Sequence, residues 1–146
     1  MTRAVWLTDI HLNFLRPVQL DKFYELVKAS KPDCVLISGD IGEAPRLQWY
    51  LQQLETRLPY PLYFVLGNHD YYSASLADVR SLVEGVTGQS KRLHWLTTSG
   101  VVELAPGVGL IGHEGWADGR AGDYAASGVL LNDYVAIRDF AGLDKF

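Results

Sequence analysis

The chain of 146 residues is predicted to adopt an α/β fold with the element order βαβαβα in its first half. Three short apolar runs, nearly continuous as in parallel strands covered on both faces, alternate with segments of helical periodicity. Each run ends in a small residue followed by Asp or Asn. Asp40 follows Asp9 by 31 residues, and Asn68 follows Asp40 by 28. These spacings suit right-handed crossover units that place the three strands in one sheet.

The helices between and after these strands show conventional start and stop signals. The first is expected to begin near Pro17, because proline suits the first turn of a helix. The second has apolar residues at helical spacing from Leu47 and stops before Pro59. The third begins at Ser75, which can form a capping box with Asp78. The three strands themselves are expected at residues 4–8, 34–39 and 62–67.

The pattern changes after about residue 92. Apolar runs at 101–104 and 108–111 flank a short turn and predict a hairpin. The glycine-rich stretch 115–128 predicts a surface loop, and a last helix is expected from Leu131 to the C-terminus. Of the four tryptophans, Trp6, Trp49 and Trp95 are expected in the core, and Trp116 is the candidate for substrate contact.

Composition narrows the class of protein. A content of 48% hydrophobic and 21% charged residues indicates a single soluble globular domain. Thirteen basic against seventeen acidic residues give a net charge of −4, which disfavours a surface for nucleic acid or anionic membranes. The one cysteine, Cys34, lies in an apolar run and is expected as a buried thiol. A signal peptide and an apolar window of membrane-spanning length are both missing, so we expect a cytoplasmic protein.

Polar side chains gather where the three predicted strands end. Ligands of an open parallel sheet bind beyond the carboxyl ends of its strands. Oxygen and imidazole donors favour Mn²⁺, Fe, Zn²⁺ or Mg²⁺, and Asp40 on the middle strand is the natural bridge between two ions. Each motif alone also suits a cap or a tight turn, but their common position favours a shared metal site. The residues concerned are Asp9, His11, Asp40, Asn68, His69 and Asp70.

The succession of Asp9-x-His11, Gly39-Asp40 and Gly67-Asn68-His69-Asp70 resembles the first three motifs of the calcineurin-like metallophosphoesterase family. The resemblance covers about residues 4–72, and the segment 116–120 is similar to a loop of some bacterial members. It implies a layered sheet of metallophosphoesterase type and hydrolysis of a small phosphomonoester or phosphodiester by a two-metal mechanism. It further implies that Asp9 and His11 bind the first ion, Asp40 bridges and Asn68 binds the second. His69, oriented by Asp70, would protonate the leaving group or stabilise charge on the phosphoryl oxygens.

The family's later histidine motifs find no full counterpart in this chain. Gly112-His113 could supply a metal ligand, a substrate contact or a plain loop, and His94 is expected as a strand or surface residue. We therefore expect the domain over residues 1–146 to lack its C-terminal half, so that the second half of the sandwich is incomplete. Truncation, another copy of the chain or a partner chain would each account for this. The alternative function is a non-catalytic protein-binding scaffold with the same fold and an incomplete metal site.

Overall fold

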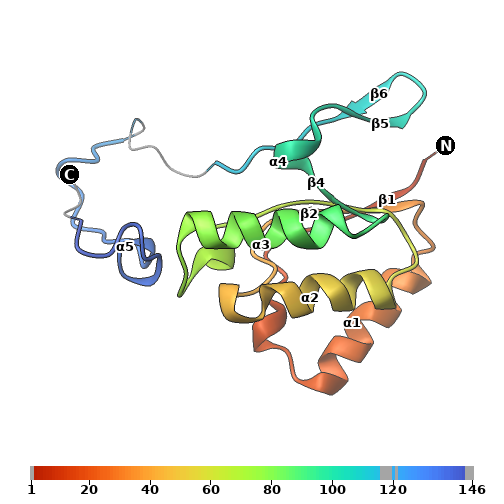
Figure 1. The fold of residues 1–146 in the computed structure, drawn as a ribbon, viewed down its shortest axis with the longest axis horizontal. Coiled ribbons are helices and arrows are strands. Elements are labelled where there is room, and N and C mark those ends of the chain that lie inside the picture. Colours follow the sequence, from red (N-terminus) through yellow and green to blue (C-terminus); the bar gives the residue numbers. More distant parts are fainter. Residues whose placement is uncertain (1, 116–119, 121, 144–146) are drawn as a thin grey trace.

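The computed structural model describes residues 2–115, 120 and 122–143. Its central sheet has four parallel strands in the order β1-β2-β3-β4 (Figure 1). The three predicted strands are confirmed, and β4 adds a fourth at the edge, where His94 stacks on Tyr63 of β3 with ring centroids 4.8 Å apart. The strands are β1 (Ala4–Leu7), β2 (Cys34–Ser38), β3 (Leu62–Val65) and β4 (Leu93–Trp95).

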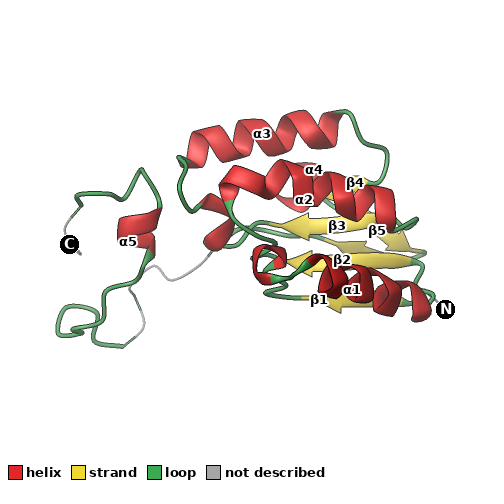
Figure 2. Cartoon of the chain, turned by 90° about the horizontal axis from the view of Figure 1, so that it is seen from below, coloured by secondary structure: helices red, strands yellow, loops and turns green. Residues whose placement is uncertain are grey.

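The three predicted helices are confirmed and lie on the same side of the sheet (Figures 1 and 2). They are α1 (Pro17–Ala29), α2 (Ala44–Arg57) and α3 (Leu76–Gly88). Proline stands in the first turn of α1 and of α2, where its missing N–H has no helical partner to lose. The hydroxyl of Ser75 accepts the Asp78 N–H at 3.1 Å at the start of α3, so this half of the predicted cap forms.

The core lies between these helices and the facing side of the sheet. Alternate strand residues point into it, since successive side chains of a strand point to opposite faces. The buried strand residues on this face are Val35, Ile37, Leu62, Phe64, Leu93 and Trp95. They pack against buried helix residues that include Tyr24, Leu47, Tyr50, Leu51, Leu54, Val79 and Val83.

Long helices cover only one face of the sheet, and residues 110–113 reach part of the other, so the prediction that the strands are covered on both faces holds in part. The strand order follows the chain order, and right-handed crossovers in that order place α1, α2 and α3 on one side. Trp6 therefore points to the other face and is 72% exposed, while Trp49, on the outer side of α2, is 38% exposed. Only Trp95, at 2% exposed, confirms the core prediction for these tryptophans. Cys34 is a buried thiol as expected.

The predicted hairpin forms a separate antiparallel sheet of β5 (Val102–Ala105) and β6 (Val108–Leu110) after the short helix α4 (Leu96–Ser99). It lies on the opposite side of the main sheet from α1, α2 and α3 (Figure 1). Two single-turn 3₁₀ helices, η1 (Leu12–Phe14) and η2 (His69–Tyr71), follow β1 and β3.

The long C-terminal helix predicted from Leu131 was wrong, because α5 spans only Asp133–Ala136. The helix stops at Ile137, whose backbone is extended and whose side chain is fully buried in the core. The next N–H, of Arg138, donates to the Ala74 carbonyl oxygen at 3.0 Å instead of continuing the helix. Burial of one apolar side chain and pairing with another loop thus override the local helical pattern.

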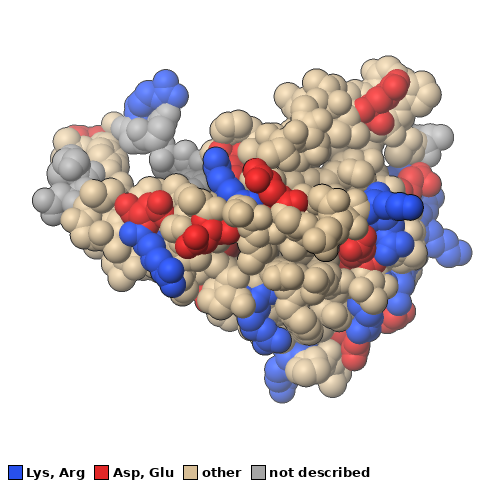
Figure 3. Space-filling model, in the orientation of Figure 1, with Lys and Arg blue, Asp and Glu red and all other residues tan. Residues whose placement is uncertain are grey.

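Basic and acidic side chains are mixed over the face shown in Figure 3, in keeping with the small net charge. None of the helices among the described residues combines the length and the apolar character that crossing a membrane requires.

Candidate metal centre

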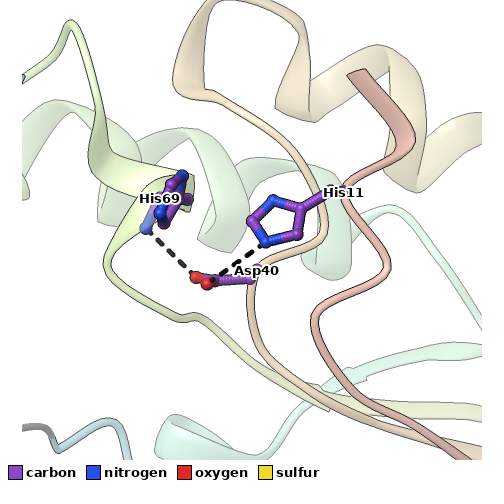
Figure 4. A group of neighbouring side chains, drawn as sticks. All are labelled: His11, Asp40 and His69. Carbon is purple, nitrogen blue, oxygen red and sulfur yellow. Dashed lines mark hydrogen bonds and ion pairs between the residues drawn. The ribbon is translucent and has the colours of Figure 1, made fainter. Parts of the chain in front are cut away.

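Three side chains from three different loops meet at the carboxyl edge of the sheet (Figure 4). His11 follows β1, Asp40 follows β2, and His69 opens η2 after β3. Each offers a ligand atom, and these atoms lie within 4.8 Å of one another. His11 Nε2 lies 3.7 Å from Asp40 Oδ2, and the His69 backbone N–H donates to Asp40 Oδ1 at 3.1 Å. The parallel sheet thus brings together residues 58 positions apart in the chain.

The backbone of these loops is held in an uncommon conformation. Asp9, His11 and Asp40 all have positive φ, at 49°, 39° and 52°. Non-glycine residues in this left-handed region cost of order 1 kcal/mol or more and cluster at functional sites. Backbone hydrogen bonds hold the first two loops together, since the His11 N–H donates to the Asp40 carbonyl oxygen at 2.9 Å. The conformation is therefore fixed by surrounding structure, which suits a preformed site.

Two glycines explain how the second and third loops approach so closely. A Cβ built on Gly39 would lie 2.7 Å from the Gly67 nitrogen, and one built on Gly67 would lie 2.9 Å from Asp40 Cγ. Real Cβ atoms essentially never come this close to other heavy atoms. Glycine at both positions is thus a steric requirement for placing Asp40 beside the loop that carries His69.

The chemistry of the group fits a divalent cation. Its donors are two imidazoles and a carboxylate, which suit Zn²⁺, Fe or Mn²⁺. The 3.7 Å separation of His11 Nε2 and Asp40 Oδ2 is too long for a hydrogen bond and shorter than twice a metal–ligand distance of about 2.1 Å. The Nδ1 atoms of His11 and His69 are buried, and neither has a hydrogen-bond partner among the residues that the structure describes. Unpartnered imidazole nitrogens beside a carboxylate are typical of a centre that holds an ion.

The other two predicted ligands, Asp9 and Asn68, make hydrogen bonds with neighbouring side chains. Asp9 is exposed, and its carboxylate accepts a hydrogen bond from the neighbouring Thr8 hydroxyl. Asn68 is half-buried, and its amide NH₂ donates to Asp133 Oδ1 at 2.7 Å and to the Tyr72 hydroxyl at 3.3 Å. Of the predicted carboxylate and histidine ligands, the structure therefore joins His11 and Asp40 and leaves Asp9 outside, and the group also contains His69, which was predicted to be catalytic.

Asp70 was expected to orient the His69 ring, but its hydrogen bonds are with backbone groups of two loops. Its buried carboxylate accepts the backbone N–H groups of Gly42 and Gly67, each at 2.9 Å. Burial raises the pKa of Asp70 to about 7, with a smaller contribution from the Asp40 charge and against the effect of these hydrogen bonds. The η2 turn directs Asp70 inward, so it ties the loops after β2 and β3 to each other.

His69 is held by aromatic neighbours instead. Its ring stacks on Tyr72 with centroids 4.2 Å apart and meets the His11 ring edge-on at 4.8 Å. Among the described residues, no hydrogen bond joins the His69 imidazole to Asp70. Packing and the backbone bond to Asp40 therefore set the position of this histidine.

Glu114 is a buried carboxylate that was not predicted from the sequence, and it supports η2 by a hydrogen bond to Tyr71. Glu114 accepts hydrogen bonds from the Tyr71 hydroxyl at 2.6 Å, the Thr97 hydroxyl at 3.0 Å and the Trp95 indole N–H. Glu114 directly follows Gly112-His113, and this position could have marked it as a candidate, but only the histidine of that motif was considered. His113 is exposed and lies outside the group of His11, Asp40 and His69.

A second carboxylate, Asp133, was also missed. It is 4% exposed and accepts hydrogen bonds from Asn68 and from the Tyr72 hydroxyl at 2.9 Å. Its segment was predicted as a helix without any site residue, and nothing in the local pattern marks it. Trp116, the candidate for substrate contact, lies outside the described residues.

Comparison with known proteins gives the following matches. The model of the calcineurin-like phosphoesterase family matches residues 2–140. A bovine (Bos taurus) protein named as a transmembrane protein with metallophosphoesterase domain is 34% identical over 93 residues, which cover 60% of this chain and 20% of that protein. An uncharacterized metallophosphoesterase of Campylobacter jejuni is 39% identical over 74 residues, 48% of this chain and 20% of that protein. The chain thus spans about a fifth of the length of these relatives. No solved structure gave a significant match.

Proposed function

The chain belongs to the calcineurin-like phosphoesterase family, and we propose that it is a metal-dependent hydrolase of small phosphomonoesters or phosphodiesters with two divalent ions in its complete site. The observation that carries this proposal is the meeting of His11, Asp40 and His69 at the carboxyl edge of the sheet. The strained loop conformations and the close glycine contacts support it, because they hold the loops that carry these side chains close together.

In this proposal, Asp9 and His11 hold one ion, Asp40 bridges and Asn68 holds the second. When bound, Mn²⁺, Fe, Zn²⁺ or Mg²⁺ ions would generate a nucleophilic hydroxide at neutral pH and clamp the phosphate oxygens. The ions would also supply the positive field that a chain of net charge −4 lacks. Asp40 is suited to bridging because it is on the middle loop and its two oxygens face different neighbours, His11 and His69.

His69 is proposed to give a proton to the leaving oxygen or to stabilise charge that develops on the phosphoryl group. Its imidazole is half-buried at the edge of the site, and stacking on Tyr72 limits its rotation. A positioned general acid contributes roughly 10²–10⁴-fold to the rate. The alternative of a non-catalytic protein-binding scaffold would need no such group.

Metal loading of the Asp40→Asn variant tests the proposal. The purified chain is incubated with Mn²⁺, freed of unbound ion, and analysed by elemental mass spectrometry and by hydrolysis of p-nitrophenyl phosphate and its bis ester. We expect bound Mn²⁺ and hydrolysis in the original chain and the loss of both in Asp40→Asn. The control is Asp21→Asn, which removes an exposed carboxylate on α1 that pairs with Arg57 and is not part of the group of His11, Asp40 and His69.

Retention of both Mn²⁺ and hydrolysis by Asp40→Asn would refute the assignment. Binding of Mn²⁺ without hydrolysis of either ester by the original chain would favour the scaffold. A chain that takes up no Mn²⁺, Zn²⁺ or Mg²⁺ under these conditions would contradict the metal centre itself.

A further inference from the structure

We propose that Asp133 is a positioning residue that turns the Asn68 amide oxygen toward the metal centre and holds Tyr72 against His69. The inference rests on the proposed function, because it assigns a purpose to Asn68 as a ligand. Asp133 lies 65 positions after Asn68 in the chain, on the segment that contains α5.

The position of Asp133 is fixed by several independent contacts of its segment. The Ser73 N–H donates to the Ala136 carbonyl oxygen at 2.7 Å, and the Leu76 N–H donates to Asp139 Oδ2 at 2.7 Å. Ile137 is fully buried in the core between these contacts. The segment 133–139 is thus attached along the length of the loop that begins at Asn68 and runs to α3.

Hydrogen-bond chemistry determines which end of the Asn68 amide faces Asp133. A carboxylate only accepts hydrogen bonds, so the amide NH₂ must point to Asp133 Oδ1, 2.7 Å away. The amide oxygen then faces the opposite direction and is left for an ion. Metal ligands in proteins are commonly oriented in this way by a carboxylate that contacts their far side.

The same oxygen of Asp133 also acts on His69 through Tyr72. Asp133 Oδ1 accepts the Tyr72 hydroxyl at 2.9 Å, and the Tyr72 ring stacks on the His69 ring at 4.2 Å. Asp133 is 4% exposed, and a carboxylate this deeply buried is retained only where it is well paired. One carboxylate therefore orients both a predicted metal ligand and the predicted acid.

A swap of the two side chains tests the inference. Asp133→Asn replaces a pure acceptor by an amide that can donate or accept, so the orientation of Asn68 is no longer forced. We expect the affinity for the second Mn²⁺ to fall about 10–100-fold, the loss typical of removing an orienting group. Asn68→Asp should lose as much, because two carboxylates then face each other. The double variant Asn68→Asp/Asp133→Asn should recover affinity, since the new amide donates to the new carboxylate.

Asp139→Asn is the matched control, because it changes a carboxylate of the same segment whose bond goes to Leu76 and not to Asn68. It should bind Mn²⁺ like the original chain. A second readout needs no metal. In the metal-free protein, the Asn68 side-chain NH₂ protons should exchange slowly with solvent by NMR, and Asp133→Asn should accelerate this exchange.

Unchanged Mn²⁺ affinity in Asp133→Asn, together with no recovery in the double variant, would overturn the inference while leaving the Asp40 result intact. Unchanged exchange of the Asn68 protons would overturn it independently. If the original chain binds no metal, the proposed function fails and this inference fails with it. Dispersed NMR spectra of each variant establish that the loss is not one of folding.

Discussion

Replacement of Gly67 by alanine is the sharpest test of how the site is assembled. The backbone of Gly67 does not have positive φ, so alanine introduces no conformational strain and acts only through its methyl group. That methyl would clash most closely with Asp40 Oδ1, and it would also lie 2.7 Å from the Asp40 nitrogen, 0.7 Å short of an ordinary contact of 3.4 Å, and 2.9 Å from Asp40 Cγ. All three close contacts are with Asp40, so its backbone has to move by at least about 0.7 Å and its carboxylate by more.

We expect two measurable effects of Gly67→Ala, one on stability and one on Mn²⁺ binding. Forcing an extra methyl into a packed site costs about 1–3 kcal/mol, which urea unfolding would detect as a lower midpoint. Displacement of Asp40 should weaken Mn²⁺ binding about 10–100-fold, the range found when the groups that place a ligand are disturbed. Isothermal titration with Mn²⁺ measures the second effect.

The control is Gly85→Ala on α3, where a methyl meets no atom within 4 Å. This change should leave Mn²⁺ affinity unchanged and raise stability by about 0.5–1 kcal/mol, because alanine favours the helix over glycine. If Gly67→Ala bound Mn²⁺ and unfolded like the original chain, the close approach of the two loops would not be required, and the reasoning would be wrong.

Three further changes test other parts of the structure. Glu114→Ala should lower the free energy of unfolding, measured in urea, by about 3 kcal/mol or more, because it leaves several buried hydrogen-bond donors without an acceptor. A loss under about 1 kcal/mol would contradict the importance of these hydrogen bonds. Tyr24→Phe should be neutral or stabilising by up to about 1 kcal/mol, since the described part of the chain offers the buried hydroxyl no hydrogen-bond partner. Burial raises the pKa of Tyr24 to about 12, so stability present below pH ~10 should fall as the pH rises toward 12, and Tyr24→Phe should lack this loss in urea titrations at each pH. His69→Ala should slow hydrolysis of esters with poor leaving groups most, by roughly 10²–10⁴-fold. Equal losses for good and poor leaving groups would favour charge stabilisation over proton transfer.

Much of the fold could be predicted because its signals are local. The apolar runs before Asp9, Asp40 and Asn68 and the helices that begin at Pro17 and Ser75 lie where the pattern places them. Parallel pairing then required His11, Asp40 and His69 to meet, since the carboxyl ends of neighbouring strands share one edge.

The predictions that were wrong have a common cause, because each was overridden by contacts between segments distant in the chain. Trp6 is a large apolar residue of a type usually buried, but the direction of the crossovers places α1, α2 and α3 on the other face of the sheet. Residues from Leu131 onward have helical spacing, yet burial of Ile137 ends α5 after four residues. The periodicity of these two segments does not predict either outcome.

The amino-acid pattern by itself determined the order of strands and helices and which polar residues reach the carboxyl edge of the sheet. Only the tertiary structure decided what each of those residues contacts: Asp70 ties two loops together, Glu114 supports η2, and Asp133 reaches Asn68 from 65 residues away. The physical reason is that periodicity and capping record interactions within a few residues. A hydrogen bond between distant loops depends instead on where the packed core places their ends.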